Sequence, residues 1–207
     1  MTAEDQNEVV YVVDDDPSAR ESLCWLLGTE GIASQAFASA QAFLEFWSSD
    51  CNGCIMVDIR MPGKSGLQLQ EELNARHNLM PVIVLTGHAD VPVAIRAMKQ
   101  GAYDFLEKPY ADEELLACVK TALELGREIS DAEIEKTRAA NALENLTERE
   151  REVMCLVVEG NTNKAVAAQL GISEKTVEIH RARVMEKTAA RSLSELVRIC
   201  LILKDKL

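Results

Sequence analysis

Acidic, hydroxyl and cationic side chains follow short apolar stretches of this chain, and their types suit phosphoryl chemistry. The residues concerned are Asp14, Asp15, Asp58, Thr86 and Lys108. A carboxylate can act as a nucleophile, a lysine supplies positive charge, and a threonine hydroxyl donates a hydrogen bond to a phosphoryl oxygen. Grouped carboxylates repel one another unless a hard cation joins them, and Mg²⁺ suits one or two carboxylates with water. These residue types indicate phosphoryl transfer to a carboxylate at a magnesium site.

The apolar stretches that precede these residues predict the strands of a parallel β-sheet. They cover residues 9–13, 32–37, 54–57, 82–85 and 103–106. Amphipathic segments between and after them predict helices over residues 18–29, 40–47, 67–76, 91–100 and 112–124. Five alternating units of this kind predict an α/β doubly wound five-stranded parallel sheet. Ligands of such sheets bind at the carboxyl ends of the strands, so we expect all five residues at one edge.

Four motifs of this region resemble those of the receiver domains of two-component response regulators, over residues 8–124. They are Val-Val-Asp14-Asp15-Asp16, Val-Asp58-Ile-Arg-Met-Pro-Gly, Leu-Thr86-Gly-His and Phe105-Leu-Glu-Lys108-Pro109. The resemblance implies that Asp58 accepts phosphate from the phosphohistidine of a sensor histidine kinase. It also implies Mg²⁺, or Mn²⁺, held by Asp15, Asp58 and the backbone carbonyl of Arg60, with Asp14 acting through water.

The same resemblance assigns the residues that respond to the phosphoryl group. Thr86 and Phe105 are expected to be the switch pair, and Lys108 is expected to contact the phosphoryl group. The Lys108–Pro109 peptide bond is expected to be cis.

Two alternatives give this region another function. Asp14-Asp-Asp16-Pro-Ser18 also resembles the start of haloacid-dehalogenase-type phosphatases, but these need a later acidic pair at a strand end. Here only Ala111-Asp-Glu-Glu114 follows, at a helix start, and Asp58 stays unexplained. The other alternative is a receiver that is never phosphorylated and serves as a fixed dimerisation module; the intact acidic set counts against it. A single aspartate after a strand is commonly a turn former or cap, so the interpretation depends on five residues coinciding.

The rest of the chain predicts helices only. Residues 125–145 are rich in helix formers and lack a wide apolar stripe, which predicts a helical linker after a first domain of residues 1–124. Thr147-Glu-Arg-Glu150 is a capping box, and Ser173 and Ser192 are expected N-caps. Helices over residues 148–158, 163–170, 174–188 and 192–203 predict an all-α four-helix helix-turn-helix domain spanning residues 146–207.

The third of these helices has the composition of a DNA recognition helix. Val177, His180, Val184 and Thr188 recur at helical spacing and are expected to face the core. The segment from Leu146-Thr-Glu-Arg-Glu to Lys175-Thr-Val-Glu-Ile-His180-Arg resembles a LuxR-type DNA-binding domain, and the whole chain resembles the FixJ-like group. Asn161 and Thr188 depart from the pattern, which usually has apolar residues there. The predicted contacts to double-stranded DNA are Asn163, Lys164, Lys175, Thr176, Glu178, Ile179, Arg181, Ala182, Arg183 and Lys187.

The charge distribution agrees with a phosphoacceptor domain followed by a DNA-binding domain. The chain has 207 residues and a net charge of −12, and residues 1–124 carry 8 basic and 20 acidic side chains. Residues 146–207 carry 11 basic and 9 acidic side chains, so only this segment can approach a phosphate backbone without strong repulsion. The acidic N-terminus is not a secretory signal, and no apolar run is long enough for a membrane span. We therefore expect a cytoplasmic protein that does not bind membranes, with its cysteines reduced.

The expected mechanism is a population shift. Phosphorylation of Asp58 would remodel the surface around residues 91–100, and the family resemblance implies that this surface then forms a homodimer. The protein would be a transcription regulator, with activator the commoner mode in the family, and an activator would contact RNA polymerase. It is expected not to be an enzyme, the receiver catalysing at most its own phosphorylation and dephosphorylation.

Overall fold

The computed structural model describes residues 8–87 and 91–202. His88 of the Leu-Thr86-Gly-His motif and residue 203, the expected end of the last helix, lie outside this range. The chain forms two compact units that divide between Ser130 and Asp131. No helix in the described part of the chain is both long and apolar enough to cross a membrane. The six cysteines carry free thiols.

The first unit contains the predicted five-stranded parallel sheet. Its strands are β1 (Val9–Val13), β2 (Ala33–Phe37), β3 (Gly53–Asp58), β4 (Val82–Thr86) and β5 (Asp104–Glu107). Their order is β2-β1-β3-β4-β5, and every pairing is parallel. The register pairs Val13 with Val57 and Asp58 with Leu85, so the carboxyl ends of β1, β3 and β4 meet at one edge.

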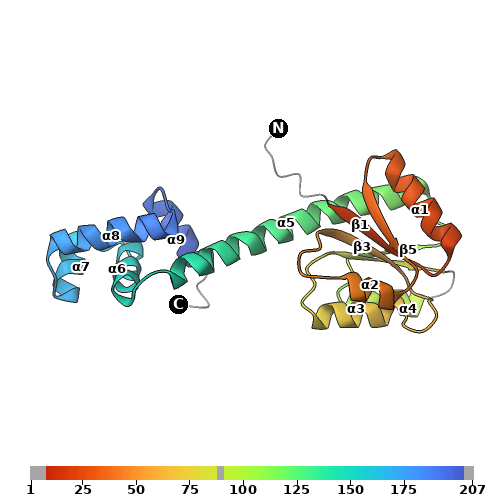
Figure 1. The fold of residues 1–207 in the computed structure, drawn as a ribbon, viewed down its shortest axis with the longest axis horizontal. Coiled ribbons are helices and arrows are strands. Elements are labelled where there is room, and N and C mark those ends of the chain that lie inside the picture. The colour runs from red at the N-terminus through yellow and green to blue at the C-terminus, as the bar shows by residue number, and fades with distance from the viewer. Residues whose placement is uncertain (1–7, 88–90, 203–207) are drawn as a thin grey trace. The chain divides into compact units, whose positions relative to one another are not determined.

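Helices cover both faces of the sheet, as the nearly unbroken apolar strands predict. They are α1 (Pro17–Thr29), α2 (Ala40–Phe46), α3 (Gly66–Ala75), α4 (Val91–Lys99) and α5 (Asp112–Glu144). Tyr11 and Val13 pack with α2, α3 and α4, whereas Val10 and Val12 pack with α1 and α5. Figure 1 shows these two groups of helices on opposite sides of the sheet. This alternation gives the unit two apolar layers and leaves the strand ends for polar residues. The helix predicted over 112–124 continues without a break through the predicted linker to Glu144.

Local features fix the loops at this edge. The Asp16 side chain accepts a hydrogen bond from the Ser18 N–H and so caps α1, while Ser65 and Gln68 form a capping box at the start of α3. Gly66 lies directly on the backbone after β3, and a Cβ there would be 2.4 Å from the Asp58 carbonyl oxygen. The chain can therefore turn into α3 immediately behind Asp58 only with glycine at this position.

The second unit is helical, as predicted, with helices α6 (Glu148–Val158), α7 (Asn163–Leu170), α8 (Glu174–Thr188) and α9 (Leu193–Ile202). Thr147 and Glu150 form the predicted capping box, and Ser173 caps α8. The Ser192 hydroxyl accepts a hydrogen bond from Glu195 N, as expected of an N-cap for α9. Gly171 ends α7 in a left-handed conformation that favours glycine, with φ of 66°. Ala139 and Leu143, from the last turns of α5, join the same core as α6 to α9.

Candidate functional sites

Asp58 ends β3 with both carboxylate oxygens engaged. Its Oδ1 accepts a hydrogen bond from Lys108 Nζ at 2.6 Å, and its Oδ2 accepts one from Arg60 N at 2.6 Å. Lys108 also donates to Asp14 Oδ2 at 2.9 Å. The structure thus brings together three of the five residues predicted for this edge: Asp58 is the last residue of β3, and Asp14 and Lys108 directly follow β1 and β5. The Lys108–Pro109 bond is cis, as expected.

Lys108 is the positive centre of this group. Burial alone would lower its pKa, but hydrogen bonds and charge interactions with Asp14 and Asp58 outweigh burial and raise the pKa above its ordinary value. The ammonium group therefore stays charged at neutral pH and offsets the repulsion between two buried carboxylates. The nearby Tyr110 hydroxyl has a raised pKa, chiefly because the ring is partly buried.

The loop after β1 holds Asp14 by several hydrogen bonds. Asp14 Oδ1 accepts from Asp16 N at 2.9 Å, and its carbonyl oxygen accepts from Arg20 Nη1 at 2.6 Å. Asp15, which lies between Asp14 and Asp16, is exposed. Sequence reasoning missed Arg20; its place one turn into the helix after the aspartates is the signal that could have found it.

Thr86 and Phe105, the predicted switch pair, lie on neighbouring strands but in different environments. Thr86 is buried at the end of β4, and its hydroxyl donates to the Gly87 carbonyl oxygen at 3.3 Å. Phe105 on β5 leaves 41% of its surface exposed. The aromatic ring therefore does not fill the space behind Thr86 in this structure.

The donors at this edge fit a hard divalent cation. No three His, Cys, Asp or Glu side chains of the described residues converge as a preformed metal site. Two carboxylates, those of Asp14 and Asp58, do converge on the Lys108 ammonium. Mg²⁺ needs only one or two protein carboxylates and completes its shell with water. Asp14 and Asp58, together with the exposed Asp15 that directly follows Asp14, therefore suit this ion.

The second unit separates the predicted DNA contacts into an exposed set and an internally bonded set. Ile179 is 48% exposed on α8, and its exposed neighbours lie on the same helix or at the start of α7. Within the described residues, the exposed set without an internal ion pair is Lys164, Lys175, Glu178, Ile179, Ala182 and Arg183, while Lys187 is also exposed but is paired with Glu150. Thr176 is half-buried, and its hydroxyl shares a hydrogen bond with the N-cap Ser173 at 2.8 Å.

The remaining three residues bond within the domain. Lys187 Nζ donates to Glu150 Oε2 at 2.7 Å, and Arg181 Nη1 donates to Asn163 Oδ1 at 2.9 Å. Arg181 lies in register with the buried Val177 and Val184 of α8. Hydrophobic periodicity cannot reveal such pairings, because the partner of each cation lies on another helix.

The residues of α8 that were predicted to face the core of this unit are buried or half-buried. Val177, Val184 and Thr188 are buried as expected, while His180 is half-buried. The two departures from the family pattern are satisfied locally: Thr188 Oγ1 donates to the Val184 carbonyl at 2.7 Å, and Asn161 Nδ2 donates to the Leu156 carbonyl at 2.9 Å. Neither polar side chain therefore introduces an unpaired group that would loosen α8.

Comparison with known proteins assigns a family to each unit. The model of the response regulator receiver domain matches residues 10–120, and that of the bacterial regulatory proteins of the luxR family matches residues 144–200. Both confirm the resemblances found in the sequence motifs.

Relatives match over nearly the whole chain. The transcriptional regulatory protein FixJ of Azorhizobium caulinodans is 48% identical over 93% of this chain and 92% of its own length. The response regulator protein TmoT of Ectopseudomonas mendocina is 39% identical over 98% of this chain and 92% of its own. The solved structure of the response regulator StyR superposes with a TM-score of 0.87 at 40% identity, covering 94% of this chain and 98% of StyR. This chain therefore belongs to the two-component response regulators, transcriptional regulators that join a receiver domain to a LuxR-type DNA-binding domain.

Proposed function

We propose that Asp58 is the phosphoacceptor of this regulator and that its phosphorylation controls DNA binding by the second domain. The observation that carries the proposal is the Asp14–Lys108–Asp58 group at the carboxyl edge of the sheet. A nucleophilic carboxylate beside a fixed ammonium is what phosphoryl transfer requires. The phosphodonor would be the phosphohistidine of a sensor histidine kinase, whose imidazole nitrogen leaves as a carboxylate oxygen of Asp58 bonds to phosphorus.

Asp15, Asp58 and the Arg60 carbonyl would hold Mg²⁺ or Mn²⁺, with Asp14 reached through water. A divalent cation bound there supplies positive charge that stabilises the charge developing on the transferred phosphoryl group. Lys108 would exchange its hydrogen bond to Asp58 for one to a phosphoryl oxygen. Beyond this self-directed chemistry we propose no enzymatic activity.

The switch would pass through Thr86 and Phe105. A phosphoryl oxygen on Asp58 offers the Thr86 hydroxyl a stronger acceptor than the Gly87 carbonyl, which it contacts at 3.3 Å. Moving Thr86 toward that oxygen vacates space that the exposed Phe105 ring can fill. The remodelled surface of α4 and β5 would then form a homodimer, which brings two recognition helices to one operator.

The DNA-binding surface would consist of Lys175, Glu178, Ile179, Ala182 and Arg183 of α8 together with the start of α7. Ile179, Ala182 and Arg183 present apolar and cationic groups suited to base edges. Lys164 and Lys175 would contact phosphates, and the N-terminus of α7 would add backbone donors. We propose action in the cytoplasm, as an activator that contacts RNA polymerase.

Light scattering after gel filtration tests the proposal directly. Wild type and Asp58→Ala would be compared with and without beryllofluoride and Mg²⁺, which mimic a phosphorylated aspartate. We expect wild type to shift from monomer to dimer and Asp58→Ala to remain monomeric. Incubation with a small-molecule phosphodonor should add the mass of one phosphoryl group to wild type only.

A dimer of wild type under all conditions, with no gain in mass, would contradict the proposal. That result would favour the alternative in which the receiver is a fixed dimerisation module. DNA binding would then be independent of Asp58.

A further inference from the structure

Glu150 was predicted only to form a capping box, but its side chain also accepts a hydrogen bond from Lys187 of α8, the predicted recognition helix. It is 2% exposed, and its Oε2 accepts hydrogen bonds from Thr147 N at 2.9 Å and Lys187 Nζ at 2.7 Å. The hydrogen bond from Lys187 is the largest cause that lowers the pKa of Glu150 to about 2. One carboxylate thus joins the start of α6 to the last turn of α8.

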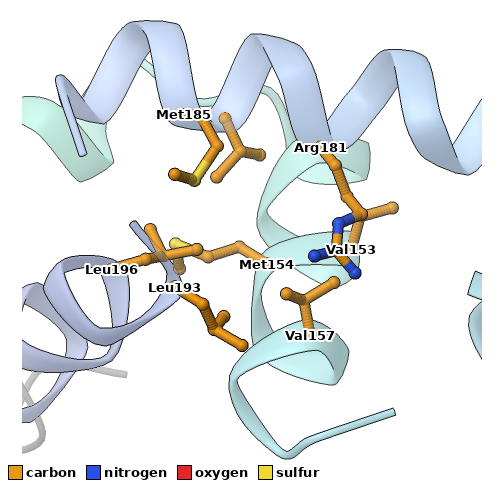
Figure 2. Close-up of a pocket in the computed structure, with 8 residues that line it drawn as sticks. Val153, Met154, Val157, Arg181, Met185, Leu193 and Leu196 are labelled. Carbon is orange, nitrogen blue, oxygen red and sulfur yellow. The ribbon is translucent and has the colours of Figure 1, made fainter. Parts of the chain in front are cut away.

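A second polar contact holds the middle of α8. Arg181 donates to Asn163 Oδ1, which belongs to the first residue of α7. The Arg181 side chain also lines a small pocket of about 100 Å³ between α6, α8 and α9, together with Val153, Val157 and Leu196 (Figure 2). Figure 2 shows the guanidinium group extending from α8 beside α6, on the inner side of the recognition helix.

We propose that Lys187 and Arg181 are positioning residues for DNA recognition rather than DNA contacts, and that Glu150 is the residue through which Lys187 acts. The inference depends on the proposed DNA-binding surface of α7 and α8. The Glu150–Lys187 contact fixes the end of α8 against α6, and the Arg181–Asn163 contact fixes its middle against α7. These two contacts would set the angle at which Ile179, Ala182 and Arg183 meet base edges.

The burial of Glu150 and its charge pair with Lys187 favour this assignment, although Lys187 itself is exposed. If Lys187 turned to a DNA phosphate, it would leave the buried Glu150 carboxylate without its cation, which is strongly unfavourable. The gain of one solvent-exposed phosphate contact is modest by comparison. Arg181 likewise orients the Asn163 amide: because Oδ1 accepts from Arg181, the Nδ2 amino group is the donor that remains for a phosphate.

Phosphate contacts and positioning contacts have different signatures in DNA-binding measurements. Loss of a phosphate contact weakens binding to all sequences equally and lowers the magnitude of the log–log salt slope by about 0.9. Loss of a positioning contact impairs base readout, so it lowers the ratio of affinities for specific and mixed-sequence DNA. Lys164 and Lys175 are exposed, and within the described residues no ion pair engages them, so they serve as matched controls.

The experiment measures fluorescence anisotropy of the full chain with two duplexes, from about 50 to about 200 mM salt. One duplex is selected by the wild-type protein from a random library, and the other has mixed sequence. We expect Lys187→Gln, Glu150→Gln and Arg181→Gln each to lower the affinity ratio by about fivefold or more, with the salt slope on mixed DNA unchanged. Lys187→Arg, which can still pair with Glu150, should restore the ratio.

The controls should behave in the opposite way, since Lys164→Gln and Lys175→Gln should lower the slope and leave the ratio unchanged. If Lys187→Gln resembles these controls, or if Glu150→Gln tightens binding by releasing Lys187, the inference is overturned. Should a single substitution prevent folding, Glu150→Gln combined with Lys187→Met removes both charges together, and a wild-type ratio in that variant would equally overturn it. Failure of wild type to select any duplex would instead contradict the proposed DNA surface.

Discussion

At the scale of single residues, each domain balances a buried carboxylate with a lysine that is distant in sequence. Asp58 is paired with Lys108 in the receiver, and Glu150 with Lys187 in the DNA-binding domain. The two pairs differ in the other hydrogen bonds that their members make. Lys108 donates hydrogen bonds to Asp14 as well as to Asp58, so its ammonium group can exchange one acceptor for another. Glu150, in contrast, is also held by the hydrogen bond from Thr147 N in its own helix cap.

The Glu150 carboxylate should make the DNA-binding domain sensitive to acid. Its pKa of about 2 lies below the ordinary value of 4.5, so the folded state favours the charged form. The resulting stability is complete above about pH 4.5 and is lost as the pH falls toward 2. We expect the urea midpoint of wild type to fall across this window and that of Glu150→Gln to fall less.

The measurement should use far-ultraviolet ellipticity, because every Trp, Tyr and Phe of the chain lies within residues 1–124 and aromatic fluorescence reports only the receiver. Glu152→Gln removes a carboxylate from an exposed ion pair with Arg149 in the same helix and is the control. Equal pH dependence of wild type and Glu150→Gln would contradict the assignment.

The sequence predicted the phosphoacceptor edge better than the DNA-binding surface for a physical reason. The carboxyl ends of parallel strands lie at one edge of a sheet, so Asp14, Asp58 and Lys108 could be assigned to that edge from the strand pattern alone. Contacts between helices depend on the crossing of helix axes and on side-chain rotamers. The partners of Arg181 and Lys187 could therefore not be read from the spacing of residues along α8.

At the scale of elements, strand positions were predicted to within one residue because apolar runs bounded by polar residues are a strong signal. The helical composition of residues 125–145 predicted the continuation of α5 to Glu144, but not the packing of its last turns, since the segment has no wide apolar stripe. Only Ala139 and Leu143 in its last turns are buried in the DNA-binding domain's core. Two apolar residues are too few to produce a recognisable pattern.

The turn from β3 into α3 leads to a prediction about Gly66. Its backbone conformation suits any residue, but a Cβ would lie 2.4 Å from the Asp58 carbonyl oxygen. Gly66→Ala should therefore destabilise the receiver by about 2 kcal/mol or more and displace Asp58. Urea denaturation followed by tryptophan fluorescence reports this domain, and beryllofluoride-induced dimerisation reports Asp58.

Gly28 in α1 is the matched control for this substitution. A Cβ at Gly28 meets nothing within 4 Å, so Gly28→Ala should leave stability unchanged or raise it by up to about 1 kcal/mol. If both alanine variants behaved alike, the close approach of α3 to the Asp58 backbone would not be the reason for glycine at position 66.

At the scale of the whole molecule, the chain divides inside a continuous helix. The boundary lies between Ser130 and Asp131, so the segment predicted as a linker contributes to both compact units. Residues 131–144 carry core residues of the DNA-binding domain and two polar contacts to it. Glu135 pairs with Arg198 at 2.8 Å, and the Leu143 carbonyl accepts from Arg151 Nη2 at 3.1 Å. The DNA-binding domain is therefore larger than its four predicted helices.

Two fragments test this larger domain. Residues 146–207 contain all four helices but lack Ala139 and Leu143, whereas residues 131–207 retain them. Because a buried leucine side chain contributes about 2 kcal/mol, we expect the shorter fragment to be less stable by about 3 kcal/mol. Urea denaturation followed by ellipticity measures the difference. Leu143→Ala in the longer fragment should reproduce most of the loss, and Asn141→Ala, on the exposed side of the same turn, should not. Equal stability of the two fragments would mean that residues 131–145 are a linker only.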